Sequence, residues 1–190
     1  MEPTLKLYMV ILGATPPGRL TEQHDIFFGI GTSLVALVPE MKASWPEAQG
    51  KIHIDAWREV TTIDNHAIRI KNKSVTVTSD QKLFFINLGG YKPGEFEEYH
   101  YKVLAVGSSL SEATKKSKAT TFYKHFGFIG ATSHIDDKYG IDIDDIYNVA
   151  DILPESFKQQ YGLEILPSRS VLQEDELHIG YVRIEKLIGN

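Results

Sequence analysis

Apolar residues gather in short runs along the chain, and each run ends at glycine, proline or polar residues. Residues 5–12 form a mostly apolar run of strand length, which predicts a strand buried on both faces. Residues 24–31 are rich in Ile and Phe and predict a second strand, while residues 51–60 alternate polar with apolar residues and predict a third. A loop containing Pro17 and Gly18 joins the first two strands, because proline lacks a ladder donor and glycine supplies the turn.

Between the second and third strands, the apolar spacing changes to that of a helix. The apolar positions recur every three or four residues, at Leu34, Leu37, Val38, Met41 and Trp45. Ser33 is expected to cap this helix, because its side-chain oxygen accepts a hydrogen bond from an amide of the first turn. Pro39 falls inside the pattern and is expected to kink the helix or split it into two short pieces.

The segment of residues 7–34 recurs at residues 83–110 with an offset of 76 and no gap. Ten of its 28 paired positions are identical, whereas average amino-acid usage gives roughly two by chance. The second copy continues with a predicted helix from Leu110 to about Phe126, with Ser109 and Glu112 as a capping box, and a predicted strand at residues 140–149. This pattern is interpreted as an internal duplication.

Each copy is expected to run strand–loop–strand–helix–strand, and the chain is predicted to be an α+β protein whose two halves pack with pseudo-twofold symmetry. Residues 1–80 would hold the first repeat and a connecting β-meander with strands at 67–71 and 74–78. Residues 81–190 would hold the second repeat with an inserted loop, a helix at 154–161 and closing strands at 163–166 and 176–184. No flexible linker separates the halves, so they are expected to pack tightly.

The repeated block also carries a family resemblance. Its pattern LGxxxPGxxxExH, followed by an apolar strand, Gly-x-Ser-Leu, a helix and HIDAWREV, resembles domain-of-unknown-function family 1543. The resemblance covers most of residues 5–150 and implies a bacterial, cytosolic protein with one or two copies of the domain, but no chemistry. The family pattern of His53, Asp55 and Trp57 is kept in the first copy, whereas the second copy has Asp142, Asp144 and Ile146.

Composition narrows the classes of function. The net charge of −5 spreads over both halves, which argues against nucleic-acid and anionic-membrane partners. The absence of cysteine excludes disulfides, thiolate zinc sites and cysteine nucleophiles. The first apolar run is too short for a membrane span and lacks the charged leader of a signal peptide, so a cytoplasmic location is expected. The partner is an unidentified small molecule or protein, and a homodimer remains open.

The polar residues that stand out lie in both copies: Glu22, His24 and Asp55 correspond to Glu98, His100 and Asp144, and His53 occurs in the first copy alone. Residues two apart on a strand share a face, so each copy is expected to gather a His and two carboxylates if its strands lie in one sheet. Such a set could hold a divalent metal, the one cofactor that the pattern suggests, or act as a general acid–base pair. The alternative is that these side chains merely stabilise the Pro-Gly loop and a solvated sheet face.

A second candidate is an anion site at the strand-to-helix turns, formed by Gly31, Thr32 and Ser33 in the first copy and by Gly107, Ser108 and Ser109 in the second. Amides and hydroxyls at a helix N-terminus favour an anion such as phosphate. Ordinary N-capping explains the same serines equally well.

No Walker motif, nucleophile elbow or other catalytic signature occurs in the sequence. The leading hypothesis is therefore a small-molecule or protein-binding module without catalysis, and whether the chain is an enzyme stays open. One alternative is a metal-assisted hydrolase that uses the Glu/His/Asp clusters, and another is a module that binds a phosphate-containing ligand at the helix N-termini. The functional cleft is predicted to lie beside the Pro-Gly loops, with the first copy favoured because His53 lies beside Asp55.

Overall fold

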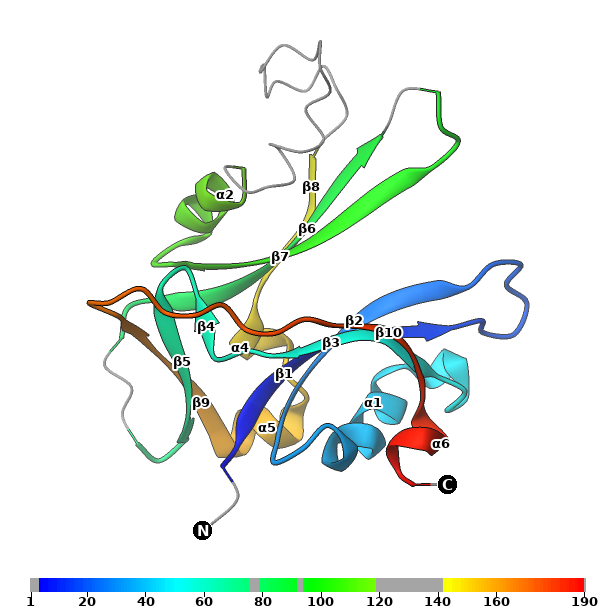
Figure 1. Cartoon of the computed structure of the whole chain (residues 1–190), viewed down its shortest axis with the longest axis horizontal. Helices are drawn as coiled ribbons and strands as arrows, with labels where there is room; N and C mark the ends of the chain where they lie inside the picture. The colour runs from blue at the N-terminus through cyan, green and yellow to red at the C-terminus, as the bar shows by residue number, and fades with distance from the viewer. Residues whose placement is uncertain (1–3, 76–78, 92–93, 119–141, 190) are drawn as a thin grey trace. The chain divides into compact units, whose positions relative to one another are not determined.

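A computed structural model describes residues 4–75, 79–91, 94–118 and 142–189 (Figure 1). These residues form three antiparallel sheets and a few short helices, which confirms the predicted α+β class. Contacts divide the chain into two compact units, one of Met1–Thr78 with Ile152–Asn190 and the other of Ser79–Asp151. The first unit therefore includes the C-terminal residues from Ile152 onward, which the sequence analysis grouped with the second repeat.

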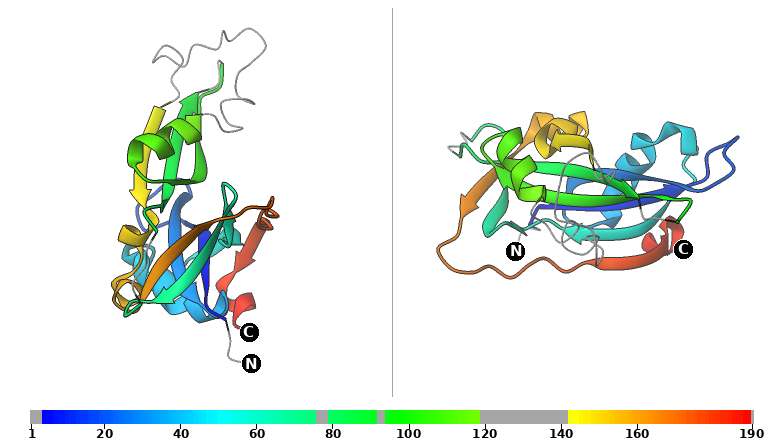
Figure 2. Two further views of the ribbon diagram at one scale, coloured as in Figure 1. Left: turned by 90° about the vertical axis from the view of Figure 1, so that its left-hand side faces the viewer. Right: turned by 90° about the horizontal axis from the view of Figure 1, so that it is seen from above.

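The first unit is built on a four-stranded sheet of order β10-β3-β1-β2. Its strands are β1 (Lys6–Ala14), β2 (Gln23–Gly31), β3 (His53–Glu59) and β10 (His178–Arg183), and their course can be followed in Figure 2. The strand β1 is buried along most of its length, as its apolar run predicts, because it is a central strand covered on both faces. The last strand comes from far along the sequence and pairs with β3 at the edge of the sheet.

The helical segment after β2 is divided, as Pro39 predicts. A single 3₁₀ turn, η1 (Val35–Leu37), leads into α1 (Val38–Ser44), and a further 3₁₀ turn, η2 (Pro46–Ala48), follows. Pro39 lies in the first turn of α1, where the missing N–H has no intrahelical acceptor to lose. The buried side chains of Leu37, Val38 and Met41 hold these pieces on the unit, and burial of a side chain of this size contributes about 1.5–3 kcal/mol.

The second sheet of this unit has the order β4-β5-β9, with β4 (Thr62–Ile63), β5 (His66–Asn72) and β9 (Tyr161–Pro167). Asp64 and Asn65 both have positive φ and form a tight turn between β4 and β5. The strand predicted at residues 74–78 is not seen at Ser74 and Val75, which lie in a turn, and its remaining residues are outside the described part. The short helices α4 (Val149–Ile152), α5 (Glu155–Gln160) and α6 (Ile184–Leu187) complete the C-terminal part.

The second unit repeats the element order of the first. The strands β6 (Lys82–Tyr91), β7 (Glu98–Gly107) and β8 (Asp142–Asn148) form a sheet of order β7-β6-β8, and α2 (Leu110–Lys118) packs on its β6 and β7 strands (Figure 2). Its core is apolar and consists of Phe84, Ile86, Leu88, Val103, Ala105 and Ala113. The predicted continuation of the helix toward Phe126 and the inserted loop lie outside the described residues.

The strand registers of the two units match at residues that the sequence repeat pairs. Gly13 lies opposite His24 on β2 and His53 on β3, and Gly89 lies opposite His100 on β7 and Asp142 on β8. Both units also have a β-bulge at the same place.

In the first unit, the register passes from Ile54 to Ala56 and skips Asp55. In the second unit, it passes from Ile143 to Asp145 and skips Asp144. A bulge of this kind redirects the side chain of the extra residue. The internal duplication and the pseudo-twofold packing themselves stay predictions.

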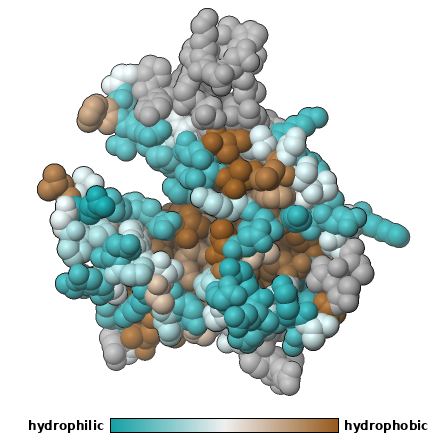
Figure 3. Space-filling model, turned by 180° about the vertical axis from the view of Figure 1, so that it is seen from behind, coloured by the Kyte–Doolittle hydropathy of each residue, from teal (hydrophilic) through white to brown (hydrophobic). Residues whose placement is uncertain are grey.

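Hydrophilic side chains cover much of the surface seen from behind, with hydrophobic ones gathered in patches between them (Figure 3). Leu20 and Phe96, at equivalent positions of the two Pro-Gly loops, are fully exposed. Within the described ranges, no helix has the length and apolar character needed to cross a membrane.

Candidate functional site

The first repeat brings four polar side chains together at one end of its main sheet. The loop between β1 and β2 delivers Glu22, the start of β2 delivers His24, and β3 delivers His53 and Asp55. His24 and His53 both lie opposite Gly13, on either side of β1, and directly opposite residues of neighbouring strands point to the same face. The bulge at Asp55 turns its carboxylate toward the same place.

The four groups form a closed ring in which imidazoles alternate with carboxylates. The Nε2 atom of His53 is 3.0 Å from Glu22 Oε1 and 3.4 Å from Asp55 Oδ2. The Nε2 atom of His24 is 3.7 Å from Glu22 Oε2 and 3.3 Å from Asp55 Oδ2. Each imidazole therefore meets both carboxylates through the nitrogen that metal ions commonly bind.

The absence of a side chain at Gly13 creates the space for this ring. A Cβ atom at this position would stand less than 3.0 Å from both His53 Nε2 and Asp55 Oδ2, closer than real Cβ atoms approach other atoms. A glycine is thus required at this position near the end of β1, so that His53 Nε2 and Asp55 Oδ2 can lie over the strand backbone.

Two atoms of the ring are buried and lack the hydrogen bonds that burial normally demands. The side chain of His53 is 12% exposed and that of Asp55 is 28% exposed. His53 Nε2 and Asp55 Oδ2 are both inaccessible to solvent and neither makes a hydrogen bond. A buried polar atom without a hydrogen bond costs about 1–3 kcal/mol, so this pair requires an explanation.

Each imidazole of the ring lies about as far from its two carboxylates as two ligands of one metal ion lie from each other. Ligand atoms about 2.1 Å from a tetrahedral ion lie about 3.4 Å from one another. The four observed separations span 3.0–3.7 Å and therefore bracket that value. A cation among these atoms would also satisfy both of the buried atoms that make no hydrogen bond. The four residues converge less closely than those of the second repeat, which form the one group of three among the described residues whose ligand atoms all lie within 4.8 Å of one another.

Tyr181 is a further residue of this site, and it was not predicted from the sequence. Its ring centroid lies 4.4 Å from that of His53, with the ring planes tilted by 39°. The pairing of β10 with β3 is irregular between Ile179 and Val182, which places Gly180 and Tyr181 beside the bulge at Asp55. A glycine inside a strand pattern often marks such an irregularity, and Gly180 was the available sequence signal.

Trp57, which belongs to the family pattern, stacks on His178 of β10. The two ring centroids are 3.8 Å apart and the planes differ by 10°. This stack lies on the strand pair that carries Asp55 and Tyr181, and it helps to hold β10 against β3 beside the ring of polar side chains.

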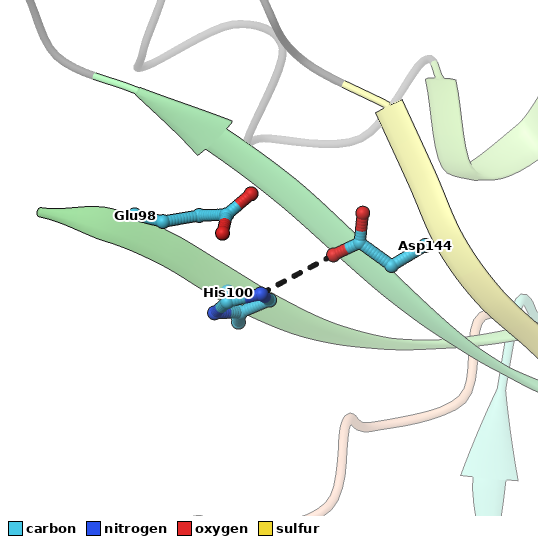
Figure 4. A group of neighbouring side chains, drawn as sticks. All are labelled: Glu98, His100 and Asp144. Carbon is cyan, nitrogen blue, oxygen red and sulfur yellow. Dashed lines mark ion pairs between the residues drawn. The ribbon is translucent and has the colours of Figure 1, made fainter.

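The second repeat gathers Glu98, His100 and Asp144, whose side chains point toward one another from β7 and β8 (Figure 4). One ligand atom from each lies within 4.8 Å of the other two, and His100 Nε2 is 3.3 Å from Asp144 Oδ2. A Cβ atom at Gly89 would stand 2.5 Å from Asp144 Oδ2, so this glycine has the role that Gly13 has in the first repeat. The set is more exposed than the first one, with His100 at 39% and Asp144 at 31%.

The strand-to-helix turns use their polar groups internally. Ser33 Oγ accepts a hydrogen bond from the Ala36 amide at 3.3 Å, which is ordinary capping of a short turn. Thr32 and the glycines Gly31 and Gly107 belong to the same turns. The anion site that was predicted at these turns stays a prediction.

In the second unit, Ser109 Oγ accepts a hydrogen bond from the Glu112 amide, as the predicted capping box requires. The Glu112 carboxylate in turn accepts hydrogen bonds from the Ser108 amide at 2.8 Å and the Ser108 hydroxyl at 2.9 Å. These bonds, together with Lys116, lower the pKa of Glu112 to about 2. The donors of this helix N-terminus are therefore already bound to a carboxylate of the protein itself.

A comparison with solved structures shows a protein with a similar fold. The chain is similar to the crystal structure of a protein Il1583 from Idiomarina loihiensis, with 23% sequence identity, 95% of this chain and 97% of that chain covered, and a TM-score of 0.61. At this identity the likeness shows a common fold. No curated protein matches the chain.

Residues 19–70 match the model of the family described as Domain of Unknown Function (DUF1543). This match confirms the resemblance that the repeated motif predicted. The matched segment includes all four residues of the ring, Glu22, His24, His53 and Asp55. The number of copies of the domain in the chain stays a prediction.

Proposed function

We propose that the first repeat binds a divalent transition-metal ion through Glu22, His24, His53 and Asp55. The observation that carries this proposal is the pair of buried atoms, His53 Nε2 and Asp55 Oδ2, held 3.4 Å apart without a hydrogen bond. A buried carboxylate and a buried imidazole are stabilised when a cation lies between them. In the sequence analysis, a metal ion at these residues belonged to the alternative of a metal-assisted hydrolase, whereas the leading hypothesis was a small-molecule or protein-binding module.

The ligand set favours an ion of intermediate softness. Two imidazole nitrogens with two carboxylate oxygens suit Zn²⁺ or Fe²⁺ better than Mg²⁺ or Ca²⁺, which prefer oxygen ligands alone. Zn²⁺ is the more favourable of the two, because four nitrogen and oxygen ligands of this kind are the usual number around it.

Four protein ligands fill a tetrahedral ion, which supports binding without catalysis, because catalytic zinc sites keep one position open. Metal-assisted hydrolysis remains a second candidate on account of Glu22. This residue lies in the loop before β2 and is close to half exposed. It is therefore the ligand whose departure would open a position for water, which the metal would activate as a nucleophile.

The same proposal includes an origin of the two units by duplication of one domain, with pseudo-twofold packing between them. The gapless repeat, the equivalent glycines and the equivalent bulges at Asp55 and Asp144 support it. The cytoplasm of a bacterium is the setting that the family resemblance implies.

Metal analysis of the whole, tag-free chain tests the metal site. The protein is stripped with a chelator, reloaded with Zn²⁺, passed through a desalting column and analysed by elemental mass spectrometry. Replacing either ring histidine, as His24→Ala or His53→Ala, is expected to lower the zinc content by about one equivalent per chain. His66→Ala is the matched control, because His66 lies in β5 of the same unit and bonds to the backbone of Asp64.

Folding of each variant is followed by circular dichroism. Glu22→Gln supplies a variant that removes an exposed charge from the ring without creating a cavity. Zinc content that is unchanged in folded His24→Ala, His53→Ala and Glu22→Gln variants would contradict the proposal.

A further inference from the structure

The second repeat carries the same backbone framework as the first, but with different side chains on it. Gly89 lies opposite His100 on one neighbouring strand, and the bulge residue Asp144 reaches over this glycine from the other. The residue opposite Gly89 on β8 is Asp142, where the first repeat has His53 opposite Gly13. The second framework therefore presents one imidazole where the first presents two.

We propose that Glu98, His100 and Asp144 form a second cation site, which binds a harder divalent ion such as Mn²⁺. The proposal rests on the convergence of three ligand atoms within 4.8 Å and on the space that only a glycine at position 89 leaves for the Asp144 carboxylate. The side chains of the three residues point toward one another in this arrangement (Figure 4). It rests on the proposed function in that both sites share one framework.

The chemistry of the ligands differs from that of the first site. Two carboxylates and one imidazole supply more oxygen than nitrogen, which suits Mn²⁺ better than it suits Zn²⁺. The exposure of His100 and Asp144 leaves them hydrated in the absence of an ion. In the first site, an ion would satisfy two buried atoms that lack hydrogen bonds, whereas the second site offers no such gain. We therefore expect the second site to bind its ion more weakly and to release it more readily.

The number of ligands differs as well. Three protein ligands leave several positions of an octahedral Mn²⁺ ion to water or to another oxygen donor. A small molecule with a carboxylate or phosphate oxygen can displace such water, whereas the four ligands of the first repeat already complete a tetrahedral ion. The second site is thus the place where the chain takes a metal ion together with an anionic small molecule.

The test uses Mn²⁺ alone as the probe and follows the electron paramagnetic resonance signal of the free aqueous ion. The whole chain is stripped with a chelator, given one equivalent of Zn²⁺ to fill the first site, and titrated with Mn²⁺. We expect the protein to remove about one equivalent of Mn²⁺ from solution. His100→Ala and Asp144→Asn are each expected to weaken this binding at least about tenfold, since even changes in the outer shell of a metal site cost that much.

His66→Ala is the matched control, because His66 lies outside both proposed sites, and it should leave Mn²⁺ binding in place. Glu98→Gln keeps size and removes one exposed charge, so it preserves the fold while lowering Mn²⁺ affinity. Mn²⁺ binding that survives His100→Ala and Glu98→Gln overturns the proposal, and so does the absence of binding at about 1 mM Mn²⁺. Loss of zinc from His24→Ala together with absent Mn²⁺ binding would retain the first site and eliminate the second, so the two proposals fail separately.

Discussion

Gly13 lies under His53 with no room for a single additional methyl group. A Cβ atom at this glycine would stand less than 3.0 Å from His53 Nε2 and from Asp55 Oδ2. The backbone of Gly13 is not among those with positive φ, so an alanine there meets no conformational strain of its own. The requirement for glycine comes from the two functional atoms above it.

Gly13→Ala is accordingly expected to displace His53 and Asp55, to abolish zinc binding at the first site, and to destabilise the protein by about 1–3 kcal/mol through overpacking. Zinc analysis and urea unfolding measure the two effects. Gly89→Ala is the matched change in the second unit, and it should leave the first site loaded while impairing Mn²⁺ binding. Normal zinc affinity in folded Gly13→Ala would show that the close approach has no role in binding.

Tyr181 should contribute to metal affinity without being a ligand. Its ring covers His53 and restricts the orientation of the imidazole. Changes to groups that orient a metal ligand lower affinity about 10–100-fold, so Tyr181→Ala is expected to weaken zinc binding by about tenfold. Ile179→Ala on the same strand is the control, because Ile179 is 82% exposed. A competitive zinc chelator measures both affinities, and equal values for the two variants would refute the positioning role.

Asp175 should be among the most sensitive positions for stability. This buried carboxylate accepts hydrogen bonds from the amides of Thr61 at 2.9 Å and Thr62 at 3.0 Å, from the Thr61 hydroxyl, and from Arg58 Nη2 at 3.1 Å. These hydrogen bonds connect the segment before β10 to β3 and to the residues that follow β3.

Asp175→Ala leaves the partly buried Arg58 without its partner and removes the acceptor of two amides, and we expect a loss of about 1–3 kcal/mol in the free energy of unfolding. Glu176→Gln, at the exposed neighbouring position, should change it by less than about 0.5 kcal/mol. Urea titrations followed by circular dichroism give both numbers. Similar midpoints for the two variants would contradict the role of Asp175.

Glu112 should make the second unit sensitive to acid. Its pKa is about 2 in the folded chain against an ordinary value of 4.5, because Ser108 donates two hydrogen bonds to its carboxylate and Lys116 lies beside it. A carboxyl group whose pKa is lowered by folding stabilises the folded state above the unfolded pKa. This contribution is present above pH 4.5 and is lost as the pH falls from 4.5 through 2.

Thermal unfolding between pH 2 and pH 6 measures the effect. Glu112→Gln is expected to lower the melting temperature at pH 6 and to flatten its dependence on pH in this window. An identical pH profile in the parent and the variant would show that the helix start does not depend on the charge of Glu112.

Local sequence patterns predicted most of the helices and strands, but they did not predict which distant strands pair with one another. The strands around the repeat follow from apolar runs, and the divided helix follows from Pro39, because both depend on residues close in sequence. The pairing of β5 with β9 and of β3 with β10 joins segments about a hundred residues apart, and no local period encodes it.

In the candidate site, too, the residues in the repeated sequence pattern were predicted, and a residue that depends on long-range strand pairing was missed. Glu22, His24 and Asp55 were proposed together because their types recur at matching positions of the sequence repeat, and the structure brings them within reach of one another along with His53. Tyr181 was not found, since its place beside His53 depends on an irregular pairing at the edge of the sheet. At the N-terminal turn of α2, Ser108 donates two hydrogen bonds to the Glu112 carboxylate, and the anion site proposed at this turn stays a prediction.

The bulges at Asp55 and Asp144 bear on how such a domain can evolve. A residue that the ladder skips can be exchanged, or its neighbours exchanged, while the paired residues on either side keep their register and the apolar core stays intact. After a duplication, one copy could therefore retain an ancestral specificity while the other drifted toward a new one, with selection acting on a few polar positions alone. Replacement of His53 by an aspartate in the first copy, and the reverse exchange at position 142, would retrace that divergence in single steps.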